Sequence, residues 1–424
     1  MVFGNSGRNG EDMLNQQDII VLGAGMVGIS TALSLQEAGH HVVVVDRKKP
    51  GQETSFGNAG IIQMEAAEPY AFPWGRSLWS AMTGKGNHIK WDMEALWQQR
   101  QALMQYAKFS LPKYYSTIAA CYATLIREAG EDHNHWLSKS TSDHLIQRKG
   151  FYNLYQSDAA LETDAAYADV LHEKYGVNSK ILDGAGIRKE EPILRDTPKG
   201  AIWWEDSWTC KDPEALTLSY SNLFLSQGGD VVCIDVQQIK KIKNGWQIEG
   251  ANTKVSGSHL VICAGPWSPI LLEPLGYKIP MIYKYGHHTH LKSLKTLHRP
   301  IMDVSQGLVV APMSRGLRIT SGAELVGRHR HPTGQQLKQG AQRLAKSFTI
   351  EADDLVIEWS GRRPCHPWML PFAGPAPHHA GLWFHFGHGH QGFTLGPTTA
   401  KILTHAFENI MAVPNLLRPV HWLG

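Results

Sequence analysis

Near its N-terminus the chain carries glycines at a spacing suited to binding a nucleotide diphosphate. The segment Gly23-Ala24-Gly25-Met26-Val27-Gly28 reads G-x-G-x-x-G. Its first glycine would permit a tight turn, its second would leave room for a pyrophosphate, and its third would let a helix pack closely on a strand. The free N–H groups at the start of such a helix attract phosphate. Asp46 follows at the distance where a carboxylate can accept hydrogen bonds from ribose hydroxyls.

The residues around this segment have the pattern of a strand, a helix and a second strand. Residues 19–22 and 42–45 are short apolar runs typical of buried parallel strands. Between them, apolar residues of 29–35 recur at helical spacing, and Gly39 ends the helix. A G-x-G-x-x-G alone could be a structural turn, but this context favours a dinucleotide site. The carboxylate of Asp46 argues against NADP, because it would face the 2′-phosphate.

Further glycine-rich segments follow along the chain. They are Ser55 to Gly60, Val261 to Ser268, Gly361 to Pro364, Leu370 to Gly374 and Gly387 to Thr394. Together with the N-terminal segment, they resemble the motifs of the glycine oxidase and D-amino acid oxidase superfamily, in family order. The chain looks most like the bacterial D-amino acid dehydrogenases. This resemblance favours FAD over NAD, which the N-terminal segment alone does not distinguish.

The resemblance implies an α/β fold, α+β overall, in which a Rossmann-like FAD-binding domain is intertwined with a mixed β-sheet substrate domain. This is the glutathione-reductase-type, D-amino acid oxidase-like arrangement. We expect a disordered lead over residues 1–16. The FAD-binding domain would comprise residues 17–90, 205–268 and 358–424, and the substrate domain residues 91–204 and 269–357.

Local patterns predict several elements within this frame. We expect a helix over 91–129, and a second helix from Pro213 to Gln227 that Asp212 caps. Strands are expected over 231–234 and 260–263, with a β-rich region over 278–320. A last helix is expected over 397–411.

The resemblance assigns a set of residues to non-covalent FAD. A glycine-rich turn that opens a helix, as at Gly392, can offer N–H groups to the negative charge that develops on a reduced flavin. Cys365 is offset from the position at which some relatives bind flavin covalently. The expected FAD-binding residues are Gly23, Gly25, Met26, Val27, Gly28, Asp46, Arg47, Ser55, Asn58, Ala59, Gly60, Val232, Ala264, Gly265, Gly374, Gly389, Gly392, Phe393 and Thr394.

Arg363 is the expected catalytic residue and substrate anchor. An amino acid brings a carboxylate into a largely dry pocket, and the planar guanidinium of arginine can bind it bidentately. By resemblance, Arg363 would hold that carboxylate beside the flavin, with Arg362 as the competing candidate. Substrate contacts are also expected from His287 and His390. No metal site is expected, because the histidines of 287–290 and 385–390 lack regular ligand spacing.

The chain departs from the family pattern in its roof sheet. Relatives often place a tyrosine in a G-Y-x-x-H stretch, where this chain has Gly286-His287-His288. Tyrosine hydroxyls commonly assist the substrate carboxylate in this superfamily. The second carboxylate contact, and with it the identity of the substrate, therefore stays open.

The implied reaction is oxidative deamination of a small amino acid, either a D-amino acid or a proline-like one. Hydride would pass from Cα to flavin N5, giving an imino acid and then a 2-oxo acid, and a quinone or another acceptor would take the electrons. One alternative is an O₂-using amine oxidase of the sarcosine or glycine type. Others are a non-catalytic flavoprotein subunit of a heteromeric dehydrogenase and an NAD-dependent enzyme that shares only the N-terminal motif.

The composition of the chain limits the kinds of partner and the cellular compartment that are expected. Lys plus Arg number 41 and Asp plus Glu number 38, so no concentrated basic surface for nucleic acid is expected. Five cysteines without a Cys-x-x-Cys pair favour a reducing, cytoplasmic compartment. No apolar run is long enough to span a bilayer. Apolar residues over 72–82 leave a peripheral contact with the inner face of the cytoplasmic membrane open, and the oligomeric state is not indicated.

Overall fold

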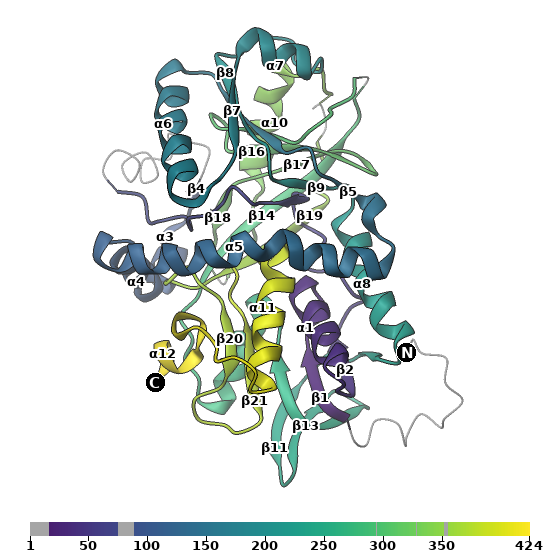
Figure 1. The fold of residues 1–424 in the computed structure, drawn as a ribbon. Coiled ribbons are helices and arrows are strands. Elements are labelled where there is room, and N and C mark those ends of the chain that lie inside the picture. Colours follow the sequence, from purple (N-terminus) through teal and green to yellow (C-terminus); the bar gives the residue numbers. More distant parts are fainter. Residues whose placement is uncertain (1–16, 75–88, 294, 328, 352–354) are drawn as a thin grey trace.

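The computed structural model describes residues 17–74, 89–293, 295–327, 329–351 and 355–424. The lead over 1–16 and part of the apolar stretch, with Leu78, Trp79 and Met82, lie outside these residues. Two large sheets organise the described chain, which crosses between them several times (Figure 1). The expected fold class, a Rossmann-like unit combined with a mixed β-sheet, is confirmed.

The first sheet is built on the expected strand–helix–strand unit. β1 (Gln17–Leu22) and β2 (Val42–Asp46) are parallel neighbours, flanked by β10 (Asp230–Cys233) and β13 (Lys254–Ile262). The apolar residues of the two central strands are almost wholly buried, as a parallel sheet covered on both faces requires. β12 (Gly245–Glu249) and β11 (Gln238–Ile242) extend the sheet beyond β13 as antiparallel strands. β21 (Leu382–Phe386) also pairs with β13, and β20 (Phe372–Pro375) pairs with β21.

Helices from distant parts of the sequence pack together beside this sheet. α1 (Met26–Glu37) contacts α8 (Pro213–Ser226) and α11 (Gly392–Phe407), and the long α5 (Pro112–Ser140) crosses α8 and α11 (Figure 1). Asp212 caps α8 as expected, because its carboxylate accepts a hydrogen bond from the N–H of Ala215 at 3.1 Å. The last long helix begins at Gly392 rather than at residue 397. Its N-terminus therefore lies directly after the Gly/His-rich loop.

The second sheet follows the order β4-β18-β14-β17-β16-β15-β6-β8-β7, and β19 also pairs with β14. Its strands are β4 (Ile89–Trp91), β6 (Phe151–Tyr155), β7 (Ser179–Asp183), β8 (Gly200–Trp204), β14 (Ile282–Leu291), β15 (Ile301–Asp303), β16 (Leu308–Met313), β17 (Gly316–Thr320), β18 (Ala323–Leu325) and β19 (Trp359–Cys365). The β-rich region expected over 278–320 is thus confirmed. β19 pairs along its length with β14, although the expected boundary at residue 358 put it with the first sheet.

Shorter elements complete the fold. The single helix expected over 91–129 is divided into α3 (Met93–Gln98), α4 (Arg100–Phe109) and α5, which starts at Pro112, a residue suited to a first helical turn. A small sheet joins β3 (Ile61–Ile62), β5 (Ile146–Gln147) and β9 (Trp208–Cys210). The remaining α-helices are α6 (Asp158–Tyr175), α7 (Gly184–Glu190), α9 (Ser268–Leu272), α10 (Gln335–Ser347) and α12 (Pro419–Leu423). In the described ranges, no helix has both the length and the apolar character needed to cross a bilayer.

The turn between β1 and α1 depends on its glycines. Gly23 has a φ of +120°, and a side chain there would collide with the carbonyl of Cys263. A Cβ at Gly28 would overlap the carbonyl oxygen of Gly23, so the third glycine brings the helix onto the strand. The first and third glycines of the motif therefore have the packing roles expected from their spacing.

We predict that Gly28→Ala destabilises the protein by about 3 kcal/mol, because the added methyl group forces α1 away from the turn. Denaturant unfolding of the flavin-free protein measures this loss. Gly392→Ala is the matched control, because its Cβ would meet neighbours only at ordinary contact distances of 3.5 Å and more. Equal stability of the two variants would contradict the packing role of Gly28.

Candidate active site

One large cavity, with a volume of about 1140 Å³, is lined by residues from both sheets. At one end it is bordered by the β1–α1 turn and the end of β2. At the other it is bordered by β14, β19 and residues of α4. This volume exceeds that of a typical pocket for a single drug-sized ligand, so the cavity has room for a dinucleotide together with a small substrate.

The first end has the features of a dinucleotide cradle. The N–H of Met26, at the start of α1, points to Ser55, whose Oγ accepts its hydrogen bond at 2.9 Å. A Cβ placed on Gly25 would lie 3.3 Å from the same Oγ, so a side chain there would occupy the cradle. Asp46 is the last residue of β2, and its carboxylate accepts hydrogen bonds from the N–H groups of Ala24, at 2.7 Å, and Lys48, at 3.0 Å. Burial raises the pKa of Asp46, and these two hydrogen bonds act in the opposite direction.

Most of the expected FAD-binding residues line this cavity. They are Gly23, Gly25, Met26, Val27, Asp46, Arg47, Ser55, Asn58, Ala59, Ala264, Gly265, Gly389, Gly392 and Phe393. The last two stand at the N-terminus of α11, where the positive end of the helix dipole meets the cavity. The residues therefore fit a group that carries phosphates, a ribose and a second anionic centre.

Five expected residues lie outside the lining and have other places in the fold. Gly28 packs α1 on its turn, and Gly374 faces Pro419 and Val413. Val232 pairs with Val45 inside the sheet, and the residues 234–236 that follow β10 line the cavity instead. Gly60 has a φ of +71° in the loop before β3, and Thr394 Oγ1 accepts a hydrogen bond from the N–H of Gln63.

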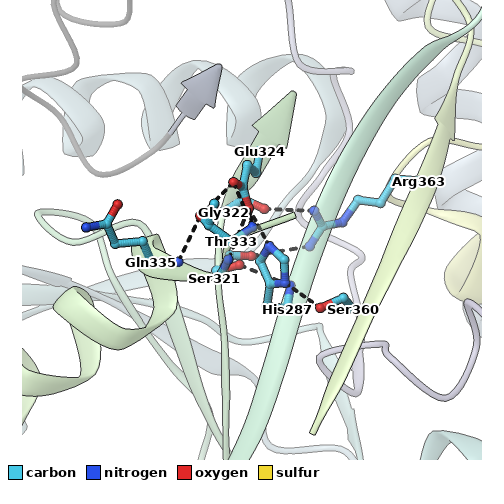
Figure 2. A network of polar contacts seen from close by, with 9 residues as sticks. His287, Ser321, Gly322, Glu324, Thr333, Gln335, Ser360 and Arg363 are labelled. Atoms are coloured by element: carbon cyan, nitrogen blue, oxygen red, sulfur yellow. Dashed lines mark hydrogen bonds and ion pairs between the residues drawn. The ribbon is translucent and has the colours of Figure 1, made fainter. Parts of the chain in front are cut away.

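Arg363 lies at the second end, in β19. Its Nη1 donates to the carbonyl of Gly322 at 2.7 Å and its Nη2 to that of Ser321 at 3.3 Å, in the turn between β17 and β18 (Figure 2). Burial lowers the pKa of Arg363, yet a guanidinium stays protonated at any ordinary pH. Within the described chain no carboxylate forms an ion pair with it. A partly buried cation that retains N–H donors and borders a cavity is suited to an anionic ligand.

Gly286 makes room for this guanidinium. It lies on β14, and a Cβ at this position would overlap the guanidinium of Arg363. Sequence reasoning noted the glycine only as a departure from the family pattern. Its role depends on the pairing of β14 with β19, which the sequence alone does not reveal.

A polar network supports the turn that holds Arg363 (Figure 2). Glu324 accepts hydrogen bonds from the backbone and hydroxyl of Thr333 and pairs with His287 Nε2 at 2.8 Å. His287 Nδ1 meets Ser360 Oγ at 2.7 Å, and its backbone carbonyl accepts from the N–H of Ser321. The Arg363-binding turn is therefore tied to both β14 and β19.

His287 does not line the cavity, so its expected substrate contact is corrected. Successive side chains of a strand point to opposite faces. Lys284, on the same strand, lines the cavity, and His287, an odd number of positions away, points to the other side. His287 supports the turn under Arg363 instead.

His390 does line the cavity. Its ring meets the ring of Tyr70 edge-on, at 5.5 Å between centroids. Burial, together with the neighbouring charges of Arg363 and Lys284, holds the pKa of His390 well below its ordinary value. The imidazole is therefore neutral, and it can accept a hydrogen bond from a ligand.

The other histidines of the two His-rich stretches have packing or hydrogen-bonding partners. His385 lies between Thr31 and Thr399, with both nitrogens 2.7 Å from their hydroxyls, and His388 also contacts Thr399. None of the residues of 287–290 lines the cavity. Within the described residues, His288, His290 and Glu358 place ligand atoms within 4.8 Å of one another, and none of the three lines this cavity.

Arg362, the competing candidate, faces a different environment. Its guanidinium lies near the rings of Trp267, Tyr283 and Tyr285, at 5.6 to 5.9 Å from their centroids. It does not line the cavity. Of the two adjacent arginines, only Arg363 borders the cavity.

We predict that Glu324→Gln destabilises the protein mainly above pH 4.5. Burial would raise the pKa of Glu324, but the hydrogen bonds from His287, Thr333 and Gly334 outweigh it and lower the pKa to about 2. A depressed carboxyl pKa stabilises the fold above the unfolded value, and this stabilisation, on the order of 3 kcal/mol, is lost as pH falls toward 2. Urea unfolding at pH 6, 4 and 3 measures it.

The difference between wild type and Glu324→Gln should shrink across that pH series. The exposed Glu173 on α6 supplies the control substitution, Glu173→Gln, which should change stability little at any pH. A Glu324→Gln deficit that stays constant from pH 6 to pH 3 would contradict the assigned network.

Comparison with known proteins agrees with this geometry. Residues 18–406 match the family model described as FAD dependent oxidoreductase. The chain is 25% identical over 398 residues to a D-amino-acid oxidase of Bradyrhizobium diazoefficiens, covering 91% of this chain and 93% of the relative. It is 28% identical over 407 residues to a D-amino acid dehydrogenase of Cereibacter sphaeroides, covering 92% and 91%.

Solved structures share the fold. A glycine oxidase from Bacillus cereus superposes with a TM-score of 0.68 at 21% identity, covering 95% of this chain and 97% of that chain. An L-proline dehydrogenase from P. horikoshii does so with a TM-score of 0.70 at 16% identity, covering 96% and 97%. From the family match over nearly its whole length, the chain belongs to the FAD-dependent oxidoreductases typified by D-amino acid oxidase.

Proposed function

We propose that this protein oxidises a small amino acid at its Cα–N bond, using non-covalently bound FAD. The observation that carries the proposal is the position of Arg363. It is a partly buried guanidinium without a carboxylate partner in the described chain, at the opposite end of a cavity whose other end is a dinucleotide cradle. Such a cation fits the α-carboxylate of an amino acid. The relatives named D-amino acid oxidase and D-amino acid dehydrogenase support the same activity.

The chain offers a distinct group to each part of FAD. The β1–α1 turn with Gly25 would hold the pyrophosphate, Asp46 the ribose hydroxyls, and the N-terminus of α11 at Gly392 the anionic side of the flavin ring. Bound there, FAD supplies the acceptor for the hydride that leaves the substrate. Cys365 is absent from the lining of this cavity, and burial raises the pKa of its thiol, both of which support non-covalent binding.

The protein contributes orientation, proton handling and a dry site. Arg363, fixed by Ser321 and Gly322, would bind the substrate carboxylate and so set the position of Cα. The neutral imidazole of His390 would accept a hydrogen bond from the substrate amine. The nearby charge of Arg363, which also lowers the pKa of His390, would favour the unprotonated amine. Apolar side chains such as Phe72, Leu96 and Leu103 line the cavity and exclude water. The imino acid product then hydrolyses in water to a 2-oxo acid and ammonia, unless it is cyclic.

A further acceptor must receive the electrons, and we propose a quinone or another carrier. Exposed apolar side chains gather in residues 70–111, among them Trp74, Met93, Trp97 and Met104, which are 49 to 72% exposed. Met93 and Met104 also line the cavity. An apolar mouth supports an apolar acceptor or contact with a membrane surface. Peroxide formation in air would instead favour the O₂-using alternative.

We predict that Arg363→Ala retains FAD but lowers kcat/KM for amino acids about thirty- to a thousand-fold, through the loss of a charge-assisted, bidentate contact. Steady-state turnover with an artificial dye measures kcat/KM, and the flavin absorbance of the purified variant measures retention. Arg362→Ala is the matched control, because it removes an adjacent guanidinium that does not border the cavity. Unchanged kinetics in Arg363→Ala would remove Arg363 from the substrate site.

We predict that Gly25→Val abolishes FAD retention, because a branched side chain would fill the cradle beside Ser55. Gly25→Ala, with one carbon, should weaken retention less. Flavin content per chain after desalting measures both variants, and circular dichroism checks that each is folded. A folded Gly25→Val variant with a full complement of flavin would place the pyrophosphate elsewhere.

A further inference from the structure

The substrate end of the cavity holds a second cation that the proposed reaction does not use. Lys284, on β14, lines the cavity and is half-buried. Its Nζ lies 5.0 Å from the centre of the Tyr106 ring, and no carboxylate of the described residues pairs with it. The stretch 75–88, whose structure is not described, contains no Asp or Glu.

Lys284 stands directly opposite Arg363 in the pairing of β14 with β19. Directly opposed residues of an antiparallel pair project from the same face, and like charges in that position are destabilising. Both charges also lower the pKa of His390, which places them around the same small region. The two facing cations repel each other, which is unfavourable when no ligand is bound. Such an unfavourable arrangement is typical of a functional site, where a negatively charged ligand would offset the repulsion.

The two cations nevertheless border different parts of the site. Arg363 is bound to the turn at Ser321 and Gly322, whereas Lys284 leans on Tyr106 of α4. A second cavity of about 40 Å³ adjoins the main one, and Lys284, Tyr106, Tyr70 and His390 line both. Arg363 does not line this second cavity. Its volume is close to that of a single small polar group, since a water molecule occupies about 30 Å³ in the liquid.

Among the described residues, no carboxylate lines this end of the cavity. The acidic residues of the main lining are Asp46, Glu53 and Asp235. Asp46 and Glu53 belong to the dinucleotide end, where Glu53 pairs with Arg47 and Lys48, and Asp235 follows β10 of the first sheet. None of the three raises the pKa of Arg363.

We propose that the substrate is a dicarboxylic amino acid, whose α-carboxylate binds Arg363 and whose second carboxylate binds Lys284 in the smaller cavity. This assignment rests on the proposed function and narrows its substrate class. Lys284 acts as a specificity-determining residue, because its charge distinguishes a terminal carboxylate from the isosteric amide. Hydroxyl-bearing and aromatic neighbours such as Tyr70 and Tyr106 shape the space around the second carboxylate.

The test compares isosteric pairs by anaerobic reduction of the enzyme's flavin, which isolates substrate oxidation from reoxidation. Glutamate is compared with glutamine and aspartate with asparagine, each as D- and L-enantiomers. In the wild type, one acid should reduce the flavin with a kcat/KM about tenfold to a hundredfold above that of its amide. Lys284→Met should lose this preference, because kcat/KM falls far more for the acid than for the amide, and Lys284→Arg should restore part of it.

Lys292→Met is the matched control, because it removes an exposed lysine directly after β14 without touching the cavity. A second readout needs no turnover. Glutarate should raise the melting temperature of the wild type more than butyrate does, and Lys284→Met should abolish the difference. Because the substitution relieves the repulsion with Arg363, the unliganded variant should be at least as stable as the wild type.

Three outcomes would overturn this inference while leaving the proposed function intact. They are equal rates with acids and amides in the wild type, an equal loss for both in Lys284→Met, and a Lys292→Met variant that loses the same preference. If no amino acid, charged or neutral, reduces the flavin, the proposed function itself fails. The two failures are thus distinguishable in one series of experiments.

Discussion

The site depends on one interaction, the binding of the Arg363 guanidinium by the backbone carbonyls of Ser321 and Gly322. Carbonyls fix a cation in place without neutralising it, so the full positive charge remains available to a ligand. A carboxylate partner would hold the side chain as firmly but would cancel that charge. The buried contact of His287 with Glu324 lies behind this turn, where it orders the turn and does not line the cavity.

The rest of the fold brings two sheets together around the cavity that Arg363 borders. The first sheet provides a turn and a helix N-terminus of ordinary dinucleotide-binding geometry. The second sheet provides the paired strands β14 and β19, from which Lys284 and Arg363 line the cavity. Because the chain passes between the sheets repeatedly, the two ends of the cavity are held in register by several segments.

Sequence reasoning succeeded where chemistry is encoded locally. The β1–α1–β2 unit follows from apolar runs, glycine spacing and the acid at position 46, all within about thirty residues of one another. The motif of Arg363 singled out an arginine that borders the cavity, and the residue type before Pro213 predicted the Asp212 cap. These features need no knowledge of distant partners.

The sequence did not reveal the roles of residues that depend on pairing between strands far apart in the chain. β19 pairs with β14 and therefore belongs to the second sheet, and this pairing places Lys284 opposite Arg363. It also explains why residue 286 is a glycine, because a side chain there would overlap the guanidinium. The same strand geometry turned His287 away from the cavity. Once residues 282–291 were recognised as a strand, alternation could have placed Lys284 and His287 on opposite faces of the sheet. Which of the two faces borders the cavity is set by tertiary structure.

The most direct test of the central claim is anaerobic bleaching of the flavin band by an amino acid and by the amine that lacks only its carboxylate. If Arg363 positions the substrate through that carboxylate, the amino acid bleaches the flavin, whereas the matched amine leaves it oxidised at the same concentration. Equal bleaching by both compounds, or a purified protein that binds no flavin at all, would contradict the account.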